Sequence, residues 1–384
     1  MQIKIPTVYM RGGTSKALFF HKADLPNDLE MRNRFLLAAF GSPDANGRQL
    51  DGIGGATTST SKVAIISPSK DPSYDVNYEF GQVSIDKPTI IYEGNCGNIS
   101  SALGPFAIDE GLVDPIEPIT KVNVYQVNTK KRIVAEVPVY KGSYQEEGNF
   151  VIDGVPRSGS KILLHFFDPG GSLSGKLLPT GNVIDEIDIP GLGIIDATII
   201  DAANPLIFVH ARDLGLKGIE ISEVDKDQAI KSKLEAIRAK GAVLLGLASC
   251  PEKASLYSQR LPMISFVSEP NYYKSLSGRM INKEEVHVVA RVLSMGTVHK
   301  SVPVTAAICI AGAAKIKGTV IYQVSREVDT EEEMILIGHP GGIMSVSAIL
   351  EKRNGEYIYK RSTIARTARR LMDGFIHVPE SFLR

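Results

Sequence analysis

The sequence predicts an α/β protein built from two similar lobes. Three observations support this class: the length of 384 residues, short segments that recur in the same order, and an alternation of strand-like and helix-like patterns in each half. A chain of this length exceeds what one ordinary hydrophobic core can hold, so about two domains are expected.

The repeated segments define the lobes. Their offset changes in one direction, from 189 (208 − 19) to 201 (264 − 63) and 207 (317 − 110), as it would if loops of different length had been inserted. One match could be chance, but three in the same order indicate two related lobes. We place the boundary so that the lobes are 1–183 and 184–384, and a return of the last segment to the first lobe stays open. The matched pairs are Phe19–Leu25 with Phe208–Leu214, Val63–Ser67 with Ile264–Ser268, and Glu110–Val113 with Lys317–Val320.

Within each lobe, β-branched runs predict strands, and apolar residues at helical spacing predict helices. Small residues face inward in the helical patterns 97–108 and 304–315, so we expect these two helices to be buried deep inside their lobes. Two similar lobes form a cleft between them, where ligands usually bind. Other helical patterns cover 29–40 and 225–240, and strand patterns cover 121–127, 133–140 and 343–350.

The composition excludes several classes of function. Lys+Arg and Asp+Glu both number 43, so no basic field is available to attract nucleic acid. No apolar run is long enough to span a membrane, and no signal peptide is recognisable. The three cysteines, Cys96, Cys250 and Cys309, form neither a complete disulfide framework nor a CxxC pair, which favours the reducing cytoplasm. We interpret Cys250 and Cys309 as structural.

Cys96 lies in the sequence Gly-Asn-Cys-Gly-Asn, directly before a small-residue helix. The N-terminus of a helix has unpaired N–H groups and a partial positive charge, which favour a thiolate or a bound carboxylate. Gly97 lets a ligand approach the backbone, and Asn95 and Asn98 add side-chain donors. A lone cysteine is more often a buried structural residue. Here the polar surroundings favour a functional one.

Lys62 ends a loop rich in glycine and hydroxyl groups and precedes a strand-like run. This loop differs from a phosphate-binding loop, whose lysine opens a helix, and it lacks the third glycine of the dinucleotide motif. What remains is a cation beside the hydroxyls of Ser59, Thr60 and Ser61, suited to an anionic substrate. A lysine in a dry cleft loses its charge readily and can act as a base. A solvated lysine at the start of a strand is the alternative.

Two further residues are candidates for substrate binding. Ser15 belongs to a turn of small polar residues between two strands, which can present N–H groups to a carboxylate or simply reverse the chain. His299 follows a helical pattern that ends at Met295–Val298 and precedes the second small-residue helix, so the repeat puts it near the lobe interface. We weight it above His339 and assign no role to the other five histidines.

A series of motifs runs through essentially the whole chain at 10–16, 41–44, 51–55, 59–62, 80–86, 94–98, 178–182, 294–296 and 338–340. Together they resemble the PrpF family, whose best-known members isomerise 2-methylaconitate, and the related 3-methylitaconate isomerase. The resemblance implies a diaminopimelate-epimerase-like fold with two pseudo-symmetric lobes. Each lobe would wrap a mainly antiparallel sheet around a central helix, with the active site in the cleft and without a cofactor. A metal site is not expected either, because the sequence has no HExxH motif and no cluster of Cys and His. The family's proposed catalytic residues fall on Lys62 and Cys96.

Epimerases of this fold use two cysteines, one from each lobe. Pairing Gly104 with Gly312, an offset of 208 (312 − 104), puts Val304 opposite Cys96, with no adjacent cysteine. A symmetrical two-thiol mechanism is therefore not expected. One lobe would supply both acid–base groups, which fits a same-side or allylic proton shift.

The resemblance thus implies a cofactor-independent isomerase that converts 2-methylaconitate from trans to cis in propionate (2-methylcitrate) metabolism. Neutral Lys62 would remove an allylic proton, and Lys62 or Cys96 would return it. A related substrate (3-methylitaconate, aconitate or oxalomesaconate) and a non-catalytic dicarboxylate-binding protein stay open. The expected partners are a small polycarboxylate and further copies of the chain, in a dimer or tetramer, with no nucleic acid and no membrane.

Overall fold

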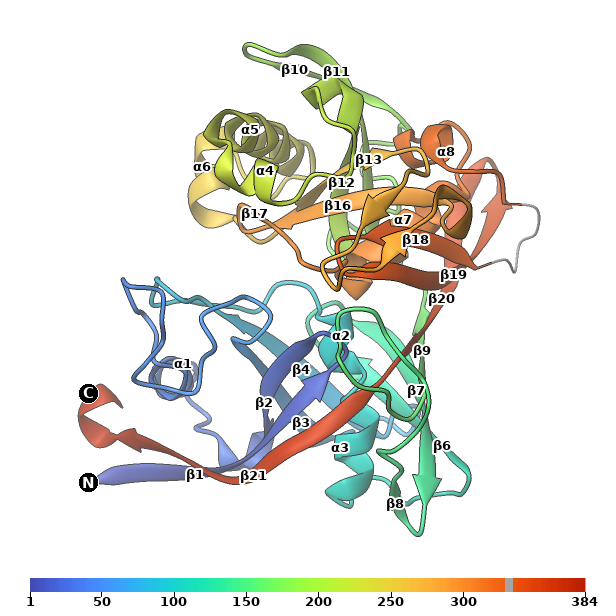
Figure 1. Cartoon of the computed structure of the whole chain (residues 1–384). Coiled ribbons are helices and arrows are strands. Elements are labelled where there is room, and N and C mark those ends of the chain that lie inside the picture. The colour runs from blue at the N-terminus through green and yellow to red at the C-terminus, as the bar shows by residue number, and fades with distance from the viewer. Residues whose placement is uncertain (329–333, 384) are drawn as a thin grey trace. The chain divides into compact units, whose positions relative to one another are not determined.

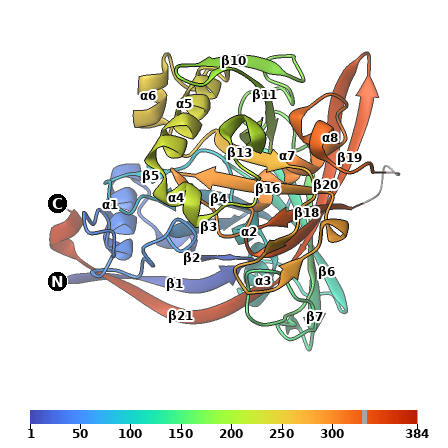
Figure 2. The same ribbon diagram turned by 45° about the horizontal axis from the view of Figure 1, so that its top comes forward.

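The computed structural model describes residues 1–328 and 334–383 (Figures 1 and 2). It divides into two compact units: unit 1 combines Met1–Leu164 with Arg366–Arg384, and unit 2 is His165–Ala365. Both chain ends, labelled N and C in Figure 1, therefore belong to unit 1. The boundary predicted after residue 183 falls inside unit 2. The last segment of the chain, from Arg366 onward, belongs to unit 1 together with the N-terminal residues.

The sheet of unit 1 joins strands that are far apart in the sequence. Its strands are β1 (Gln2–Gly12), β2 (Ser15–His21), β3 (Lys62–Pro68), β4 (Val76–Val83), β5 (Ile90–Ile91), β6 (Ile119–Gln126), β7 (Lys131–Tyr140), β8 (Ser143–Tyr144) and β21 (Ala368–Pro379). Hydrogen-bonded neighbours follow the order β21–β1–β2–β3–β4–β6–β7, while β5 pairs with β4 and β8 with β7. The pairs β2–β3 and β4–β6 are parallel, and the others named are antiparallel.

Unit 2 repeats this arrangement. The chain enters it within β9 (Ile162–Phe167), and its strands are β10 (Asp185–Ile189), β11 (Gly193–Ala202), β12 (Asn204–His210), β13 (Met263–Ser268), β16 (Val288–Ser294), β17 (Thr297–Val298), β18 (Ile335–His339), β19 (Gly342–Arg353) and β20 (Glu356–Arg366). The order β10–β11–β12–β13–β16–β18–β19–β20 is parallel at β12–β13 and β16–β18 and antiparallel elsewhere. A separate hairpin joins β14 (Tyr273–Lys274) to β15 (Met280–Ile281).

Strand register confirms the internal repeat. Phe19 pairs with Ala64 between β2 and β3, and Phe208 pairs with Ser265 between β12 and β13. The offsets between these pairs, 189 (208 − 19) and 201 (265 − 64), equal those of the repeated sequence segments. The two units therefore share a sheet topology as well as short sequence matches.

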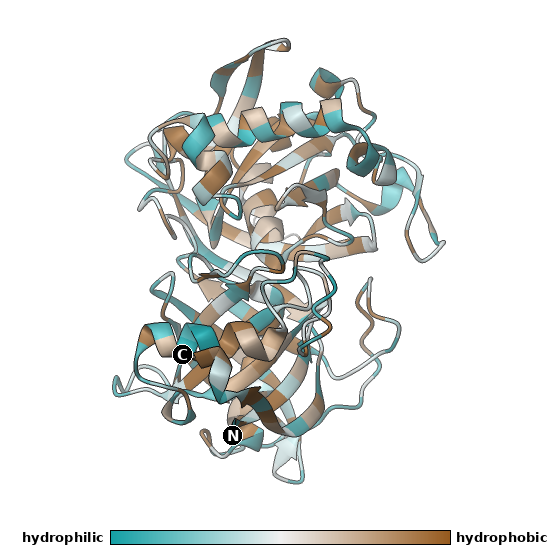
Figure 3. Ribbon diagram, turned by 90° about the vertical axis from the view of Figure 1, so that its left-hand side faces the viewer, coloured by the Kyte–Doolittle hydropathy of each residue, from teal (hydrophilic) through white to brown (hydrophobic). Residues whose placement is uncertain are grey.

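Long helices occupy equivalent crossovers between the parallel strand pairs. The helix α1 (Leu29–Phe40) begins at Asp28, whose side chain accepts the Met31 N–H at 2.8 Å, and ends at Gly41 in the left-handed region. In unit 2, α4 (Ser222–Lys226), α5 (Gln228–Leu244) and α6 (Pro251–Tyr257) follow one another, and Asp227 caps α5. Hydrophilic and hydrophobic residues alternate along α5 (Figure 3), as expected for a helix that covers one face of a sheet.

The small-residue helices are the buried ones, as predicted. In unit 1 they are α2 (Gly97–Ser100) and α3 (Leu103–Asp109); in unit 2, α7 (Val304–Ala314) is entirely buried and is followed by α8 (Val320–Val324). A β-carbon on Gly104 would lie 2.4 Å from Val137 Cγ2, and one on Gly312 would lie 2.6 Å from Tyr359 Cε1. Glycine at these two positions therefore permits each helix to approach its neighbours closely.

The helical pattern predicted up to Met295–Val298 is wrong. These residues belong to the β16–β17 hairpin, in which Ser294 pairs with Thr297. Met295 (φ 52°) and Gly296 (φ 76°) form its two-residue turn, and two positive φ angles match the twist of paired strands. β16 is buried almost throughout, so its residues show no alternation of buried and exposed positions, and periodicity alone does not distinguish such a strand from a buried helix.

Candidate active site

Lys62 is the first residue of β3 and is buried. Its partner across the β3–β4 ladder is Gln82, and Lys62 Nζ donates to Gln82 Oε1 at 2.5 Å. The same ammonium lies 5.4 Å from the centre of the Phe80 ring. The lysine is therefore anchored inside unit 1 and is not the solvated lysine of the alternative interpretation.

The loop before Lys62 is held by its own hydroxyl groups. Thr57 Oγ1 lies 2.9 Å from Ser59 Oγ and 2.8 Å from Thr60 Oγ1, and both partners are half-buried. Ser61 is fully buried, and its hydroxyl donates to Gln49 Oε1 at 2.8 Å. Ser59 and Thr60 are thus the predicted hydroxyls with solvent access, whereas Ser61 in this conformation helps to hold the loop.

Gln49 is a buried anchor for this loop that the sequence analysis missed. Besides Ser61, its Oε1 accepts the Ala56 N–H at 2.9 Å, and its Nε2 donates to Ser42 Oγ at 2.9 Å. A β-carbon on Gly54 would lie within 2.5 Å of three atoms of the Gln49 amide, so the loop backbone packs directly on it. An isolated glutamine in a loop carries no sequence pattern that would have revealed this role.

The β1–β2 turn brings Ser15 next to the Asn98 segment. Ser15 is buried at the start of β2, and the preceding Gly13 has φ +50°. Asn98 Oδ1 accepts the Thr14 N–H at 3.4 Å. On the other side, the Lys16 N–H donates to the Ser59 carbonyl at 2.9 Å. The turn therefore bridges the hydroxyl loop that precedes Lys62 and the helix that follows Cys96.

Cys96 caps α2 and is half-buried. Its carbonyl accepts the Ser100 N–H at 3.0 Å and the Ser100 hydroxyl at 3.1 Å, which starts the helix. Asn95, Gly97 and Asn98 around it are buried. The structure thus places the predicted thiol at the start of the central helical segment, with small and polar neighbours.

The returning C-terminal segment completes this region of unit 1, which no local sequence pattern indicated. The Thr367 carbonyl accepts hydrogen bonds from Gly13 N at 2.9 Å, Arg11 Nη1 at 3.0 Å and Ser101 Oγ at 3.4 Å. Arg366 beside it is fully buried, and burial lowers the pKa of its guanidinium to about 9. The turn at Gly13 and the central helix are therefore fastened by residues from the far end of the chain.

His299 belongs to unit 2, where it follows β17. Its Nδ1 lies 2.8 Å from the Ser301 carbonyl, and its own N–H donates to the Val292 carbonyl at 2.8 Å. His339 is completely buried, and its Nδ1 accepts the Gly341 N–H at 3.0 Å. His299 is half-buried and so keeps more contact with solvent than His339.

The second unit has no thiol at the position that corresponds to Cys96. α7 begins with Pro303 as its cap and Val304 as its first residue. Cys309 lies further along the helix, is fully buried and bonds the Ala202 and Asn204 carbonyls through Sγ at 3.0 Å each. Burial raises the pKa of the Cys309 thiol far above its ordinary value. The helix starts of the two units are therefore chemically unlike.

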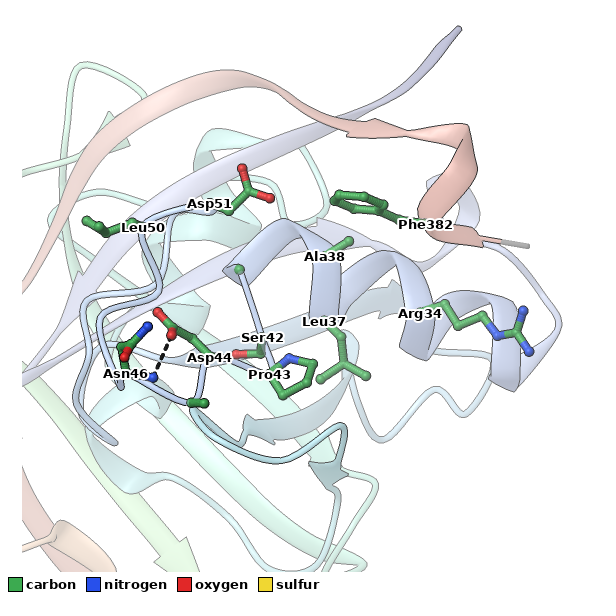
Figure 4. A pocket seen from close by; sticks show the side chains of 12 residues that line it. Arg34, Leu37, Ala38, Ser42, Pro43, Asp44, Asn46, Leu50, Asp51 and Phe382 are labelled. Atoms are coloured by element: carbon green, nitrogen blue, oxygen red, sulfur yellow. Dashed lines mark hydrogen bonds between the residues drawn. The ribbon is translucent and has the colours of Figure 1, made fainter.

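A cavity of about 650 Å³ lies elsewhere in unit 1 (Figure 4). It is bounded by α1, by the loop from Gly41 to Asp51 and by Phe382, whose ring lies beside the Ala38 side of α1 in Figure 4. The predicted site residues are not among its described lining residues. The cavity is therefore lined by other residues than the candidate site, to which Gln49 links it through hydrogen bonds with Ser42 and Ser61.

Two classes of site find no support in the described part of the chain. Over residues 1–328 and 334–383, no three His, Cys, Asp or Glu side chains are grouped as a metal ion would need. No helix within those residues has the length and apolar character that a membrane crossing needs.

Known proteins that resemble this chain match it over essentially its whole length. A family model described as "PrpF protein" matches residues 2–379. The 3-methylitaconate isomerase of Eubacterium barkeri is 44% identical over 384 residues, covering 100% of this chain and 99% of that protein. The 2-methyl-aconitate isomerase of Shewanella oneidensis is 41% identical, covering 99% of this chain and 98% of that protein.

Solved structures agree with the expected fold. A crystal structure of methylitaconate-delta-isomerase matches with a TM-score of 0.81 at 43% identity, covering 100% of this chain and 97% of that one. A hydroxyproline epimerase from Agrobacterium vitis matches with a TM-score of 0.56 at 13% identity, covering 97% and 92%. At that identity the likeness shows the fold alone, and it confirms the diaminopimelate-epimerase-like architecture.

Proposed function

Because the chain belongs to the PrpF family and is an isomerase of unsaturated acids, we propose that its substrate is 2-methylaconitate, converted from trans to cis by an allylic proton shift. One observation carries this proposal. The amine of Lys62 is held in a buried position at the end of a hydroxyl-rich loop, where a general base beside an anion site is needed.

The proposed reaction breaks one C–H bond and forms one. Neutral Lys62 takes the allylic proton on Nζ, and the electron pair is delocalised through the neighbouring double bond into a carboxylate, giving a dienolate. Rotation about the former double bond and return of the proton to the same carbon give the other geometric isomer. A positioned base contributes about 10²–10⁴-fold to such a step.

The remaining acceleration is assigned to donors that stabilise the dienolate. Ser59 and Thr60 offer hydroxyls, Ser15 lies in the adjoining turn, and Asn95 and Asn98 flank Cys96. Removal of one such donor typically costs about 10²–10³-fold in other enzymes. Gly97, with no side chain, would let a carboxylate approach the backbone at the start of α2, and Ser61 would act through the loop that it holds.

Cys96 is proposed to return the proton or to orient the substrate. The unlike helix starts of the two units support a single-thiol arrangement, because Pro303 and Val304 can exchange no proton. His299 remains a proposed binding residue for a substrate carboxylate.

A second candidate substrate is 3-methylitaconate. The relative that carries this name is 44% identical, and the structure with the corresponding title is 43% identical. The same base would remove the proton from one carbon, and reprotonation would occur at the methylene carbon, so the double bond would move. Aconitate and oxalomesaconate remain further alternatives of the same chemistry, and a dicarboxylate-binding protein without turnover is the non-enzymatic one.

The test is an NMR screen in D₂O. The protein, first dialysed exhaustively against EDTA, is incubated separately with 2-methylaconitate, 3-methylitaconate, aconitate and oxalomesaconate. The proposal expects interconversion of the 2-methylaconitate isomers, with solvent deuterium entering the allylic position and no requirement for added metal. Turnover of another acid alone would reassign the substrate, and binding without exchange would indicate a non-catalytic protein.

The cellular setting is proposed with the substrate. A role in propionate metabolism through 2-methylcitrate, a cytoplasmic location, independence of cofactors and assembly into a dimer or tetramer all stay predictions.

A further inference from the structure

We propose that Gln82 is a positioning residue for Lys62, an inference that rests on the proposed role of Lys62 as the base. The two residues are direct partners across the β3–β4 ladder, which holds their β-carbons about 5 Å apart. Gln82 is 2% exposed, and its Oε1 receives the hydrogen bond from Lys62 Nζ at 2.5 Å. A buried amide therefore faces the proposed base at hydrogen-bonding distance.

The orientation of this amide is fixed by its other end. Gln82 Nε2 donates to the Ser61 carbonyl at 2.9 Å and to the Thr58 carbonyl at 3.1 Å. Carbonyl oxygens only accept hydrogen bonds, so the NH₂ group must face the loop and the oxygen must face Lys62. The hydrogen bonds to the loop therefore fix the orientation of the Gln82 amide, and this orientation places Oε1 as an acceptor beside the Lys62 amine.

This arrangement has two consequences for the reaction. Because one N–H of Lys62 is committed to Gln82, the lone pair of its neutral form lies in one of the other two positions on the nitrogen and points away from the amide. The same glutamine also holds the loop that carries Ser59 and Thr60. The side chain of Gln82 therefore fixes the position of Lys62 relative to the hydroxyls of Ser59 and Thr60.

The strands next to Lys62 also carry an aromatic ring and several charged side chains. Phe80, on the same strand as Gln82, presents its ring at 5.4 Å, which favours the charged amine but does not titrate. The charged side chains on the adjacent strands have partners of their own: Glu79 with Arg32 and Lys22, Lys16 with the ring of Tyr9, and His21 with Glu110.

The experiment compares Gln82→Glu with Gln82→Met in the full-length protein. The titration midpoint of Lys62 is read from the ¹³Cε shift in lysine-labelled protein, with the signal assigned by its loss in Lys62→Ala. A carboxylate at this distance stabilises the ammonium form, so Gln82→Glu should raise the midpoint by about one pH unit or more. Gln82→Met removes an acceptor for the charged form and should lower the midpoint. The acid limb of the kcat/KM profile should move in the same directions.

Gln49→Met is the matched control, because Gln49 is an equally buried glutamine that holds the same loop through Ser61 and Ala56. It should lower the thermal midpoint of unfolding as Gln82→Met does, yet leave the Lys62 titration unmoved. Equal titration shifts in both methionine variants would overturn the inference, since loop damage would then explain them.

An unchanged midpoint in Gln82→Glu would also overturn the inference, and this variant decides alone if Gln82→Met does not fold. The proposed function is tested separately. Full turnover by Lys62→Ala would show that Lys62 is not the base, whatever the result of the titrations.

Discussion

Gly13 and Asn98 are packed so closely that a β-carbon on Gly13 would lie 2.2 Å from Asn98 Oδ1. Gly12 is also tightly packed, since its β-carbon would lie 2.5 Å from the Asn98 carbonyl oxygen. The β1–β2 turn thus rests directly on the first turn of α2, next to Cys96. Glycine is needed here for the close approach and, at Gly13, for a φ of +50°.

The first prediction is that Gly13→Ala lowers both stability and turnover. The new methyl group must displace Asn98, and a non-glycine residue at this φ adds strain, so the free energy of unfolding should fall by about 1–3 kcal/mol. Urea unfolding and turnover of the screened substrate measure the two effects.

Gly142→Ala is the control for this variant, because Gly142 has φ +76° and open space around its β-carbon position. The free energy of unfolding of Gly142→Ala should fall because of backbone strain, but its kcat/KM should equal that of the wild type. Equal kinetics for the two variants would argue against a role of the Gly13–Asn98 contact in the site.

The second prediction concerns Lys62. Lys62→Ala should stay folded and lose activity by at least the general-base factor of about 10². Lys62→Arg keeps a cation but cannot supply a neutral base at ordinary pH, so it should be equally inactive. Steady-state kinetics, with circular dichroism as the folding control, measure this. Substantial activity in Lys62→Arg would mean that the residue serves only as a positive charge.

The third prediction concerns the thiols. Cys96 is half-buried at the start of α2, whereas Cys309 is fully buried, so brief alkylation should modify Cys96 and spare Cys309. Cys250 is also half-buried and serves as the internal control. A bound polycarboxylate should protect Cys96 but not Cys250, which peptide mapping by mass spectrometry would show. If Cys96 is alkylated equally with and without the polycarboxylate, the substrate does not bind next to Cys96.

The fourth prediction is a pH dependence of stability from Glu110. Burial raises the pKa of this carboxyl, but hydrogen bonds from His21 and Arg370 outweigh burial, so the pKa lies below its ordinary value of 4.5. A carboxyl with a lowered folded-state pKa stabilises the protein above the unfolded pKa and loses that contribution as the pH falls through the folded one.

Glu110→Gln should therefore reduce the free energy of unfolding at pH 7 by roughly 1 kcal/mol or less, because the group is partly exposed. The difference from the wild type should shrink as the pH falls below about 4.5. Urea unfolding at several pH values measures it, and Glu147→Gln, at an exposed position, is the reference. If the difference in the free energy of unfolding between Glu110→Gln and the wild type stays constant with pH, the loss comes from packing and not from the charge of Glu110.

Local patterns in the sequence predicted much of the fold. The helix predicted at 29–40 coincides with α1, because Asp28 and Gly41 are a recognisable cap and stop. The repeated segments predicted two related lobes, and two of the three matched pairs lie in the corresponding strand pairs β2–β3 and β12–β13. The hairpin at Met295–Gly296 was missed because its first strand, β16, is buried on both faces and lacks the alternation that identifies a strand.

The sequence by itself determined the family, the two-unit repeat and the candidates Lys62 and Cys96, because motifs and periodicity are properties of neighbouring residues. Only the tertiary structure decided which groups surround them. Gln82 meets Lys62 through strand register, and Thr367 reaches Gly13 from the other end of the chain. Such partners are fixed by the packing of distant segments, which leaves no local signature: a buried amide or carbonyl gains its role only from the group that folding brings to it.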